Sequence, residues 1–369
     1  MRTKGDRHII NDDSIPRWFK ENAQESNRYL YILGMGFDER MCEGIRRFAK
    51  CQIPFDIWKI YYDEGIGSPS KKYVNKSSEN ETVLDRIIAE KNGIRVQEKS
   101  IKFWQDDGEQ TREDGRSRFV GEINASKIIK CSEEELGSYS DIIVDVSALP
   151  QAIYLCILNT LFKCSGTNQR LYIVANENYT TDMRIEPKQA EESAHEIQGY
   201  TSPSDGIDGI LIWYPIIGEK NLRYLDKYYV YLKRHSQEIA EICPVVPFPA
   251  VNVRRADDIL SEYSGKLFDD WRVDKKNIIY ASETNPLLVS KNLFEISENY
   301  AHALKPLGNC KFVFSAITSK LMTIGMLLAA FDLKSRGYNV SILGISNKGY
   351  TIERVEEKTT QNKLICLAV

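Results

Sequence analysis

Histidine is scarce in this chain of 369 residues, which contains only four, and none stands near a second histidine or a cysteine at metal-ligand spacing. The eight cysteines include no CxxC pair, and most of them lie inside apolar runs. This usage is typical of free, buried thiols in a reducing compartment. We therefore expect no metal site.

Long apolar runs and a surplus of charge are also missing. No stretch approaches the roughly 18 apolar residues of a membrane span, and residues 1–17 lack the apolar core of a signal peptide. Lysine and arginine number 49 against 52 aspartate and glutamate, for a net charge of −3. No global field therefore draws the chain to duplex nucleic acid or anionic lipid. We expect a cytoplasmic protein with no membrane association.

The familiar catalytic signatures are absent as well. The sequence contains no GxxxxGK[ST], HExxH or GxSxG segment and no kinase-type DFG set. Isolated histidines and scattered cysteines offer no nucleophile and base pair, although a triad assembled from distant loops stays open. Whether the protein is an enzyme, and which cofactor it binds, is therefore not fixed by the sequence.

Short apolar runs rich in β-branched and aromatic residues alternate with amphipathic segments along most of the chain. This pattern predicts an α/β fold built from βαβ units around buried, mostly parallel sheets. The expected strands lie at 29–33, 55–62, 94–96, 141–146 and 171–174 in the first half, and at 210–213, 242–246, 277–281, 311–314 and 339–343 in the second.

The order of elements in the first half recurs in the second. Ser147 and Ser315 stand 168 residues apart along the numbering, as do Val174 and Ile342 in the strands that follow. This spacing predicts two Rossmann-like lobes that arose by internal duplication, although any two doubly wound halves look alike at this level of detail. The predicted divisions are an N-terminal arm, a first lobe, a linker and a second lobe, at 1–28, 29–180, 181–207 and 208–369.

Ligands of open α/β sheets bind beyond the carboxyl ends of the strands, which directs attention to the loops there. Gly34 and Gly36 follow the first predicted strand, as at the start of a dinucleotide fingerprint. The third glycine of that fingerprint is replaced by Glu39, and Asp38 and Glu39 would repel a phosphate. A tight turn capped by Asp38 is therefore favoured over a nicotinamide site.

The segment from Ser315 to Lys320 is the strongest candidate for anion binding. The hydroxyls of Thr318 and Ser319, the free N–H groups of a helix start and the lysine converge where a phosphate would be stabilised. Its counterpart in the first half begins at Ser147, which is expected to cap the next helix. Ordinary helix capping is the alternative for both turns.

Further polar residues stand at predicted strand ends. Asp145 closes a buried strand, where a carboxylate is either a satisfied structural residue or a functional one, and Asn176 follows the next strand. Arg254 follows a proline-rich exit that could aim its guanidinium at phosphate. Glu283 and Asn285 stand where a ribose hydroxyl or a base edge could be bound.

Two fused Rossmann-like halves, each with a strand-to-helix turn of small hydroxyl residues at 145–150 and 314–320, resemble the duplicated CARF and SAVED-type sensors of bacterial immunity. The resemblance spans roughly residues 29–350. It implies one pocket at the strand ends of both halves for an oligonucleotide second messenger. Because this sequence has no segment to spare for an effector domain, it also implies a separate effector protein.

Three functions are therefore compatible with the sequence. The first is a binding protein for a nucleotide or another phosphorylated small molecule, as a sensor or assembly subunit in bacterial defence signalling. The second is a two-lobed transferase or hydrolase acting on a nucleotide or phosphosugar. The third is a scaffold whose loops bind a protein partner.

Overall fold

The computed structural model describes residues 7–24, 26–51, 53–91, 93–105, 119–164, 169–190, 193–201, 209–235, 238–353 and 362–369. The chain forms two compact units, Met1–Ala190 with Asn347–Val369, and Glu191–Ser346. Each unit is an α/β body built on its own largely parallel sheet, so the predicted fold class is confirmed.

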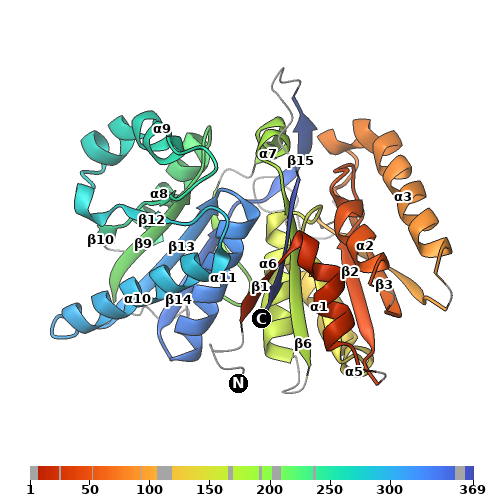
Figure 1. Ribbon diagram of the computed structural model, residues 1–369. Coiled ribbons are helices and arrows are strands. Elements are labelled where there is room, and N and C mark those ends of the chain that lie inside the picture. The colour runs from red at the N-terminus through yellow and green to blue at the C-terminus, as the bar shows by residue number, and fades with distance from the viewer. Residues whose placement is uncertain are drawn as a thin grey trace. The chain divides into compact units, whose positions relative to one another are not determined.

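The first unit is organised around a sheet whose parallel strands run in the order β4-β3-β2-β5-β6. Two antiparallel strands, β16 and β1, continue this sheet beyond β6 (Figure 1). The strands are β1 (His8–Asn11), β2 (Tyr29–Gly34), β3 (Phe55–Asp63), β4 (Val96–Lys102), β5 (Asp141–Asp145), β6 (Arg170–Glu177) and β16 (Lys363–Ala368).

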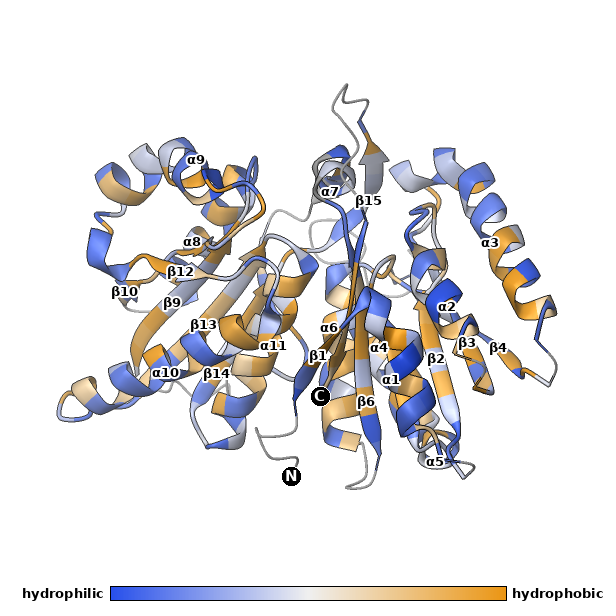
Figure 2. Ribbon diagram, in the orientation of Figure 1, coloured by the Kyte–Doolittle hydropathy of each residue, from blue (hydrophilic) through white to orange (hydrophobic). Residues whose placement is uncertain are grey.

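Helices of the first unit cover the sheet because its central strands are apolar on both faces (Figure 2). Residues of α1 and α2, such as Phe19 and Phe48, pack with Tyr31, Ile143 and Val174 in one core cluster. The helices are α1 (Ile15–Asn22), α2 (Met41–Ala49), α3 (Val74–Ala89), α4 (Gly121–Cys131), α5 (Glu133–Gly137), α6 (Gln151–Cys164) and α7 (Tyr179–Arg184).

The sheet of the second unit has the corresponding order, β12-β11-β9-β13-β14, and ends on the antiparallel strand β8. Strand β10 lies beside β9 just before β11. The strands are β8 (His195–Glu196), β9 (Ile210–Ile217), β10 (Ile239–Ile242), β11 (Val245–Pro247), β12 (Ile279–Ala281), β13 (Cys310–Ile317) and β14 (Asn339–Gly344).

The helices of the second unit follow the strands as βαβ crossovers require. Leu225 and Tyr228 of α8 and Ile259 of α9 pack with Trp213 and Val313 in the core cluster of this unit. The helices are α8 (Leu222–His235), α9 (Arg255–Glu262), α10 (Pro286–Leu304) and α11 (Lys320–Ser335). The shared strand order is that of a doubly wound sheet in general, so internal duplication stays a prediction.

The structure corrects the predicted domain limits. Residues 347–369 were assigned to the second lobe, but β16 pairs with β6 and β1 of the first sheet, where its apolar side chains are buried. The arm 1–28 likewise contributes β1 and α1 to the first unit. The sequence predicts two strands at 350–355 and 364–369 joined by a polar turn. Strand β15 (Asn347–Ile352) instead pairs with β7 (Ile185–Ala190) in a small separate sheet.

Two predicted surface segments also differ from expectation. The composition of 65–81 predicts a surface loop, but this stretch forms a short 3-10 helix and the first half of α3. The predicted linker 181–207 includes most of α7, all of β7 and the short strand β8. The charged stretch 105–118 is also predicted to be a surface loop, and all of it but Gln105 lies outside the described residues. No helix within the described part of the chain is long and apolar enough to cross a membrane.

Candidate functional site

The order of parallel strands reverses once in each sheet, between β2 and β5 in the first unit and between β9 and β13 in the second. Loops that leave neighbouring strands at such a reversal run toward opposite faces of the sheet, which opens a crevice at its carboxyl edge. These two edges carry most of the residues nominated from the sequence. They are described separately.

The loops of the first unit close over its reversal point. A side chain added at Gly34 would lie 2.6 Å from Cδ2 of Leu149, which is itself buried. The Tyr62 hydroxyl packs against Gly36 and donates a 2.9 Å hydrogen bond to the Ala148 carbonyl. Side chains of the protein therefore fill the space where a phosphate would approach a glycine turn, and the structure argues against Gly34 and Gly36 as ligand contacts.

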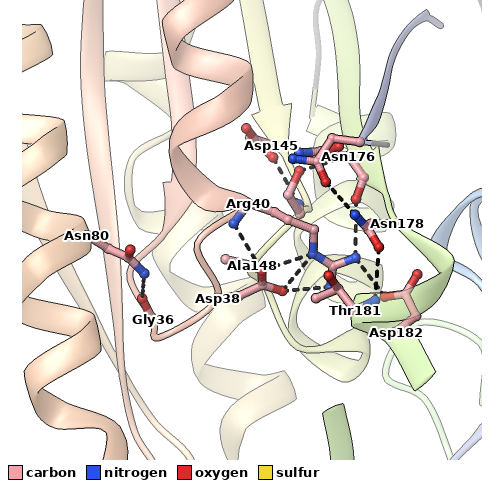
Figure 3. A network of polar contacts seen from close by, with 12 residues as sticks. Gly36, Asp38, Arg40, Asn80, Asp145, Ala148, Asn176, Asn178, Thr181 and Asp182 are labelled. Carbon is pink, nitrogen blue, oxygen red and sulfur yellow. Dashed lines mark hydrogen bonds and ion pairs between the residues drawn. The ribbon is translucent and has the colours of Figure 1, made fainter. Parts of the chain in front are cut away.

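A buried arginine binds two carboxylates at this edge of the sheet (Figure 3). The guanidinium of Arg40, which is 2% exposed, donates to both carboxylate oxygens of Asp38 and, at 2.7 Å, to Asp182 of α7. Burial acts to lower the pKa of Arg40, but the charges of Asp182 and Asp38 outweigh it and raise the pKa. Asp38 also accepts the backbone N–H of Arg40 at 3.1 Å, so it caps the turn as expected from the sequence and is in addition an ion-pair partner of Arg40.

Asp145 is a satisfied structural residue. It is 1% exposed, and its carboxylate accepts a 2.7 Å hydrogen bond from the Tyr31 hydroxyl and a 2.9 Å bond from the Ser147 N–H. The backbone of α2 covers it, because a side chain at Gly44 would overlap both Asp145 and Tyr31. Burial raises the pKa of Asp145 from 3.8 to about 6, although hydrogen bonds from Ser147 and Tyr31 act in the opposite direction.

Ser147 and Asn176 meet at the same edge, but in a different way than predicted. The Ser147 hydroxyl accepts the Asn176 N–H at 2.9 Å, so it ties two strand ends together instead of capping a helix. The Asn176 side chain is completely buried, and both atoms of its amide lack a hydrogen-bond partner among the described residues. An amide left in this state fits a bound water or a small polar group.

A buried arginine of the second unit likewise binds two carboxylates, and we call each such group of one arginine and two carboxylates an arginine clasp. Arg255, which is 6% exposed, donates two hydrogen bonds of 2.7 and 2.8 Å to Glu219 and also pairs with Glu283. Glu283 further accepts the Val251 N–H at 2.7 Å. Its carboxylate is thus used within the protein, and the predicted ribose contact is not supported. These residues follow β9, β11 and β12, so the clasp lies on one side of the reversal point.

The reversal point of the second unit is built from two helix starts. Asn221, just before α8, donates to the Ile317 carbonyl at 3.3 Å, and a side chain at Gly218 would lie 2.6 Å from that same oxygen. Ser319 caps α11 by accepting the Met322 N–H, as the capping alternative expects. Lys320 begins α11 and is half-buried.

Two lysines stand at these helix starts. Lys220, in the left-handed region with φ of 60°, is exposed beside the start of α8, and its N–H donates a 3.0 Å hydrogen bond to the Glu262 carboxylate. Neither Lys220 nor Lys320 forms a side-chain ion pair with any residue that the structure describes. Thr318 is half-buried, and among the described residues its hydroxyl has one hydrogen-bond partner, the Met322 sulfur at 3.6 Å. Thr318, Ser319 and Lys320 therefore stay together as candidate anion contacts.

The remaining nominated residues divide between buried and exposed positions. The Ser315 hydroxyl lies inside β13 and accepts the Trp213 indole N–H at 3.0 Å, so it is structural. Asn285 caps α10 by accepting the N–H groups of Leu287 and Leu288. Arg254 is exposed, and its guanidinium has no hydrogen bond or ion pair within the described ranges.

Sequence reasoning missed the two central arginines and two of their partners, Asp182 and Glu219. Arg40 lies within a nominated loop and two residues after Asp38, which was a usable signal, whereas Asp182 and Glu219 lay in segments expected to be a linker and a turn. Arg255 pairs with Glu219 and Glu283, which follow other strands. Within the described residues, no cluster of His, Cys, Asp or Glu could hold a metal ion.

Comparison with known proteins does not assign a family. No family model matches the chain, and no curated protein matches it. Among solved structures, a universal stress protein from Archaeoglobus fulgidus DSM 4304 is similar at 11% identity over 86% of this chain and 95% of the other, with a TM-score of 0.23. The cytoplasmic domain of a prokaryotic cation chloride cotransporter is similar at 12% identity over 87% of this chain and 96% of the other, with a TM-score of 0.24. Scores of this size carry no functional argument.

Proposed function

We propose that the protein binds a nucleotide or another phosphorylated small molecule at the carboxyl edge of the second unit, where α8 and α11 begin. One observation carries this proposal: the helix starts meet at the reversal point, with Lys220 and Lys320 beside them and unpaired within the described residues. Helix N-termini and lysine ammonium groups are the groups that stabilise phosphate.

A buried hydroxyl without a hydrogen-bond partner among the described residues supports the same location. Ser346 follows β14, is 2% exposed, and its hydroxyl has no hydrogen-bond partner among the described residues. Strands β13 and β14 are parallel neighbours, so Thr318 and Ser346 both follow the carboxyl ends of adjacent strands.

Binding is favoured over catalysis by the state of the neighbouring carboxylates. Glu219 and Glu283, which follow adjacent strands, are both committed to Arg255, and a general acid or base must be free to exchange a proton. A role in defence signalling, with a separate effector, is the more specific form of the proposal that the CARF and SAVED resemblance implies.

The proposal is tested by titrating the protein with inorganic phosphate and with a set of nucleoside mono- and triphosphates. Loss of one charge-assisted hydrogen bond costs about 1.5–3 kcal/mol, so Lys320→Ala should weaken the tightest of these ligands by roughly tenfold or more. Lys305→Ala is the matched control, because Lys305 follows the C-terminal end of α10 in the same unit. Equal affinity of both variants, or no binding of any probe to the wild type, contradicts the proposal.

Turnover separates the binding protein from the enzyme. Each nucleotide is incubated with the protein, and its products are followed by chromatography. We expect the bound nucleotide to be recovered unchanged. Hydrolysis or transfer that disappears in Lys320→Ala would instead support the two-lobed enzyme.

A further inference from the structure

A patch of exposed apolar side chains lies on the second unit, in the segment 248–254 between β11 and α9. Val251 and Val253 are 77% and 74% exposed, and Phe248 is 49% exposed. The Phe248 ring packs edge-on against Tyr280 of β12 at 6.0 Å between centroids, and Tyr280 is itself 48% exposed. We call these four residues the β11–β12 patch.

The patch is held rigidly in place. The Phe248 N–H bonds the Ala281 carbonyl at 2.8 Å, and the Glu283 N–H bonds the Pro249 carbonyl at 3.0 Å. The Val251 N–H bonds the Glu283 carboxylate, which Arg255 fixes in turn. A loop whose backbone is tied down cannot turn its valines inward, so the apolar surface is already arranged for contact.

The neighbouring edge of the sheet offers main-chain hydrogen bonds. Strand β12 is the terminal strand in the described sheet order, and its Ile279 N–H and Ala281 carbonyl point toward the β11 side. Because successive peptide groups alternate along a strand, the N–H and carbonyl of Tyr280 point away from β11. Within the described residues these outward groups have no partner, which is the feature that accepts an added strand.

The charge beside the patch indicates what kind of strand would be added. Arg254 directly follows Val253, is exposed, and has no carboxylate within ion-pair distance among the described residues, and the exposed Asp257 and Asp258 stand further on, in the first turn of α9. A partner that covers the valines would also cover the guanidinium, and burying it without a counter-charge is unfavourable. The complementary surface is therefore apolar with a carboxylate.

We propose that the β11–β12 patch docks an extended segment of a partner protein, in which an aspartate or glutamate stands among apolar residues and the backbone adds to β12. The carboxylate pairs with Arg254, and the apolar side chains cover Val251, Val253 and Phe248. This surface uses none of the groups assigned to phosphate binding. The two proposals therefore stand or fall separately.

Selection from a library of random short peptides displayed on phage tests the proposal. The wild type should enrich sequences with an acidic residue among apolar ones, and Arg254→Glu should change the enriched residue to lysine or arginine. The double variant Val251→Ser, Val253→Ser should bind the enriched peptides at least tenfold more weakly. Leu307→Ser is the control, since Leu307 is also 77% exposed but lies in the turn between α10 and β13.

Strand addition is tested with the enriched peptides and two variants of Tyr280. Tyr280→Pro removes the outward N–H as well as the ring, whereas Tyr280→Ala removes only the ring, so proline should weaken binding more. Equal losses would overturn the added strand. Enrichment that ignores Arg254→Glu, or no enrichment at all, would overturn the docking site. A wild-type dimer that the double valine variant dissociates would show that a second copy occupies the patch, which also overturns it.

Discussion

Each unit buries one arginine between two carboxylates at the carboxyl edge of its sheet, but the two clasps lie at different places relative to the strand reversal. Arg40 follows β2 and reaches Asp182 beyond β6, so its clasp passes across the reversal point of the first unit. Arg255 joins residues that follow β9, β11 and β12, all on one side. The same arrangement of one arginine and two carboxylates therefore covers the reversal point of the first unit but not that of the second.

The difference shows that strand order alone does not decide which edge binds a ligand. Around the first reversal point, burial and the charges of Glu64 and Asp38 raise the pKa of Tyr62 well above its ordinary value, and Asp145 and Asp182 add further carboxylates. An edge this acidic disfavours phosphate. The second reversal point also has carboxylates, but Glu219 is paired with Arg255 and Glu262 accepts the Lys220 N–H. It carries in addition the side chains of Lys220 and Lys320, and this is why we assign the anion to the second unit.

Substituting a buried arginine and an exposed one should give the largest difference in stability. Arg40→Ala leaves Asp38 with a buried charge that has lost its partner, so we expect a loss of about 3–5 kcal/mol in the free energy of unfolding. Arg254→Ala, at an exposed position, should change it by less than about 0.5 kcal/mol. Urea denaturation measures both. Similar small losses would mean that the Arg40 clasp does not seal the first edge.

The packing of α2 over the sealed edge gives the next largest effect. In Gly44→Ala the added methyl group would overlap Asp145 and Tyr31, and overpacking together with a displaced hydrogen bond costs about 2–4 kcal/mol. Gly137→Ala, where a methyl group meets open space, should be neutral or slightly stabilising. A tolerated Gly44→Ala would show that the edge has room, and thus that it is not closed.

Asp145 makes the stability of the first unit depend on pH. Its pKa is 3.8 ordinarily and about 6 when folded, so the folded state holds the proton more tightly. The stabilisation of the folded state by protonated Asp145 is fully present below pH 3.8. It is lost as the pH rises through about 6, which lowers the free energy of unfolding by on the order of 2–3 kcal/mol. Asp145→Asn lacks this loss, so its stability relative to the wild type should rise from pH 4 to pH 7 in urea titrations. A constant difference would mean that Asp145 titrates normally.

Ser147 and Ser319 belong to the two corresponding strand-to-helix turns, and replacing their hydroxyls should give modestly different losses of stability and clearly different effects on binding. Ser319→Ala loses a helix cap, for about 1 kcal/mol, and should weaken phosphate binding. Ser147→Ala leaves the buried Asn176 N–H unpaired, for about 1–3 kcal/mol, and should leave phosphate affinity unchanged. Thermal melts with and without phosphate measure both quantities. A loss of phosphate affinity in Ser147→Ala, with none in Ser319→Ala, would instead place the site in the first unit.

Most strands could be predicted from the sequence because the buried strands are continuous apolar runs. Runs such as 29–33 and 141–146 are confirmed as β2 and β5, since a strand covered on both faces needs little else to be recognised. The C-terminal strand β16 is just as apolar, but its partners β6 and β1 are distant in sequence, and pairing of that kind leaves no local signal. This is why residues 347–369 were placed in the wrong unit.

The candidate site was only partly predictable for the same reason. The rule of strand ends located the right loops, and the hydroxyl and lysine pattern at 318–320 identified a helix start. Whether a polar residue such as Asp145 or Ser315 faces a ligand or a neighbouring strand depends on the packing of distant elements. The arginine clasps depend on partners 142 and 36 residues away, a separation that spacing rules do not cover.

The most direct test of the central claim is to titrate isotope-labelled protein with inorganic phosphate and to follow the backbone amides by nuclear magnetic resonance. The amides at the starts of α8 and α11, among them those of Leu222 and Lys320, should shift in a saturable way, because N–H groups at a helix start donate to the anion. The amides of Arg40 and Ser147 should stay in place. Saturable shifts around Arg40 and Ser147, with none at Lys320, would contradict the assignment of the anion to the second unit.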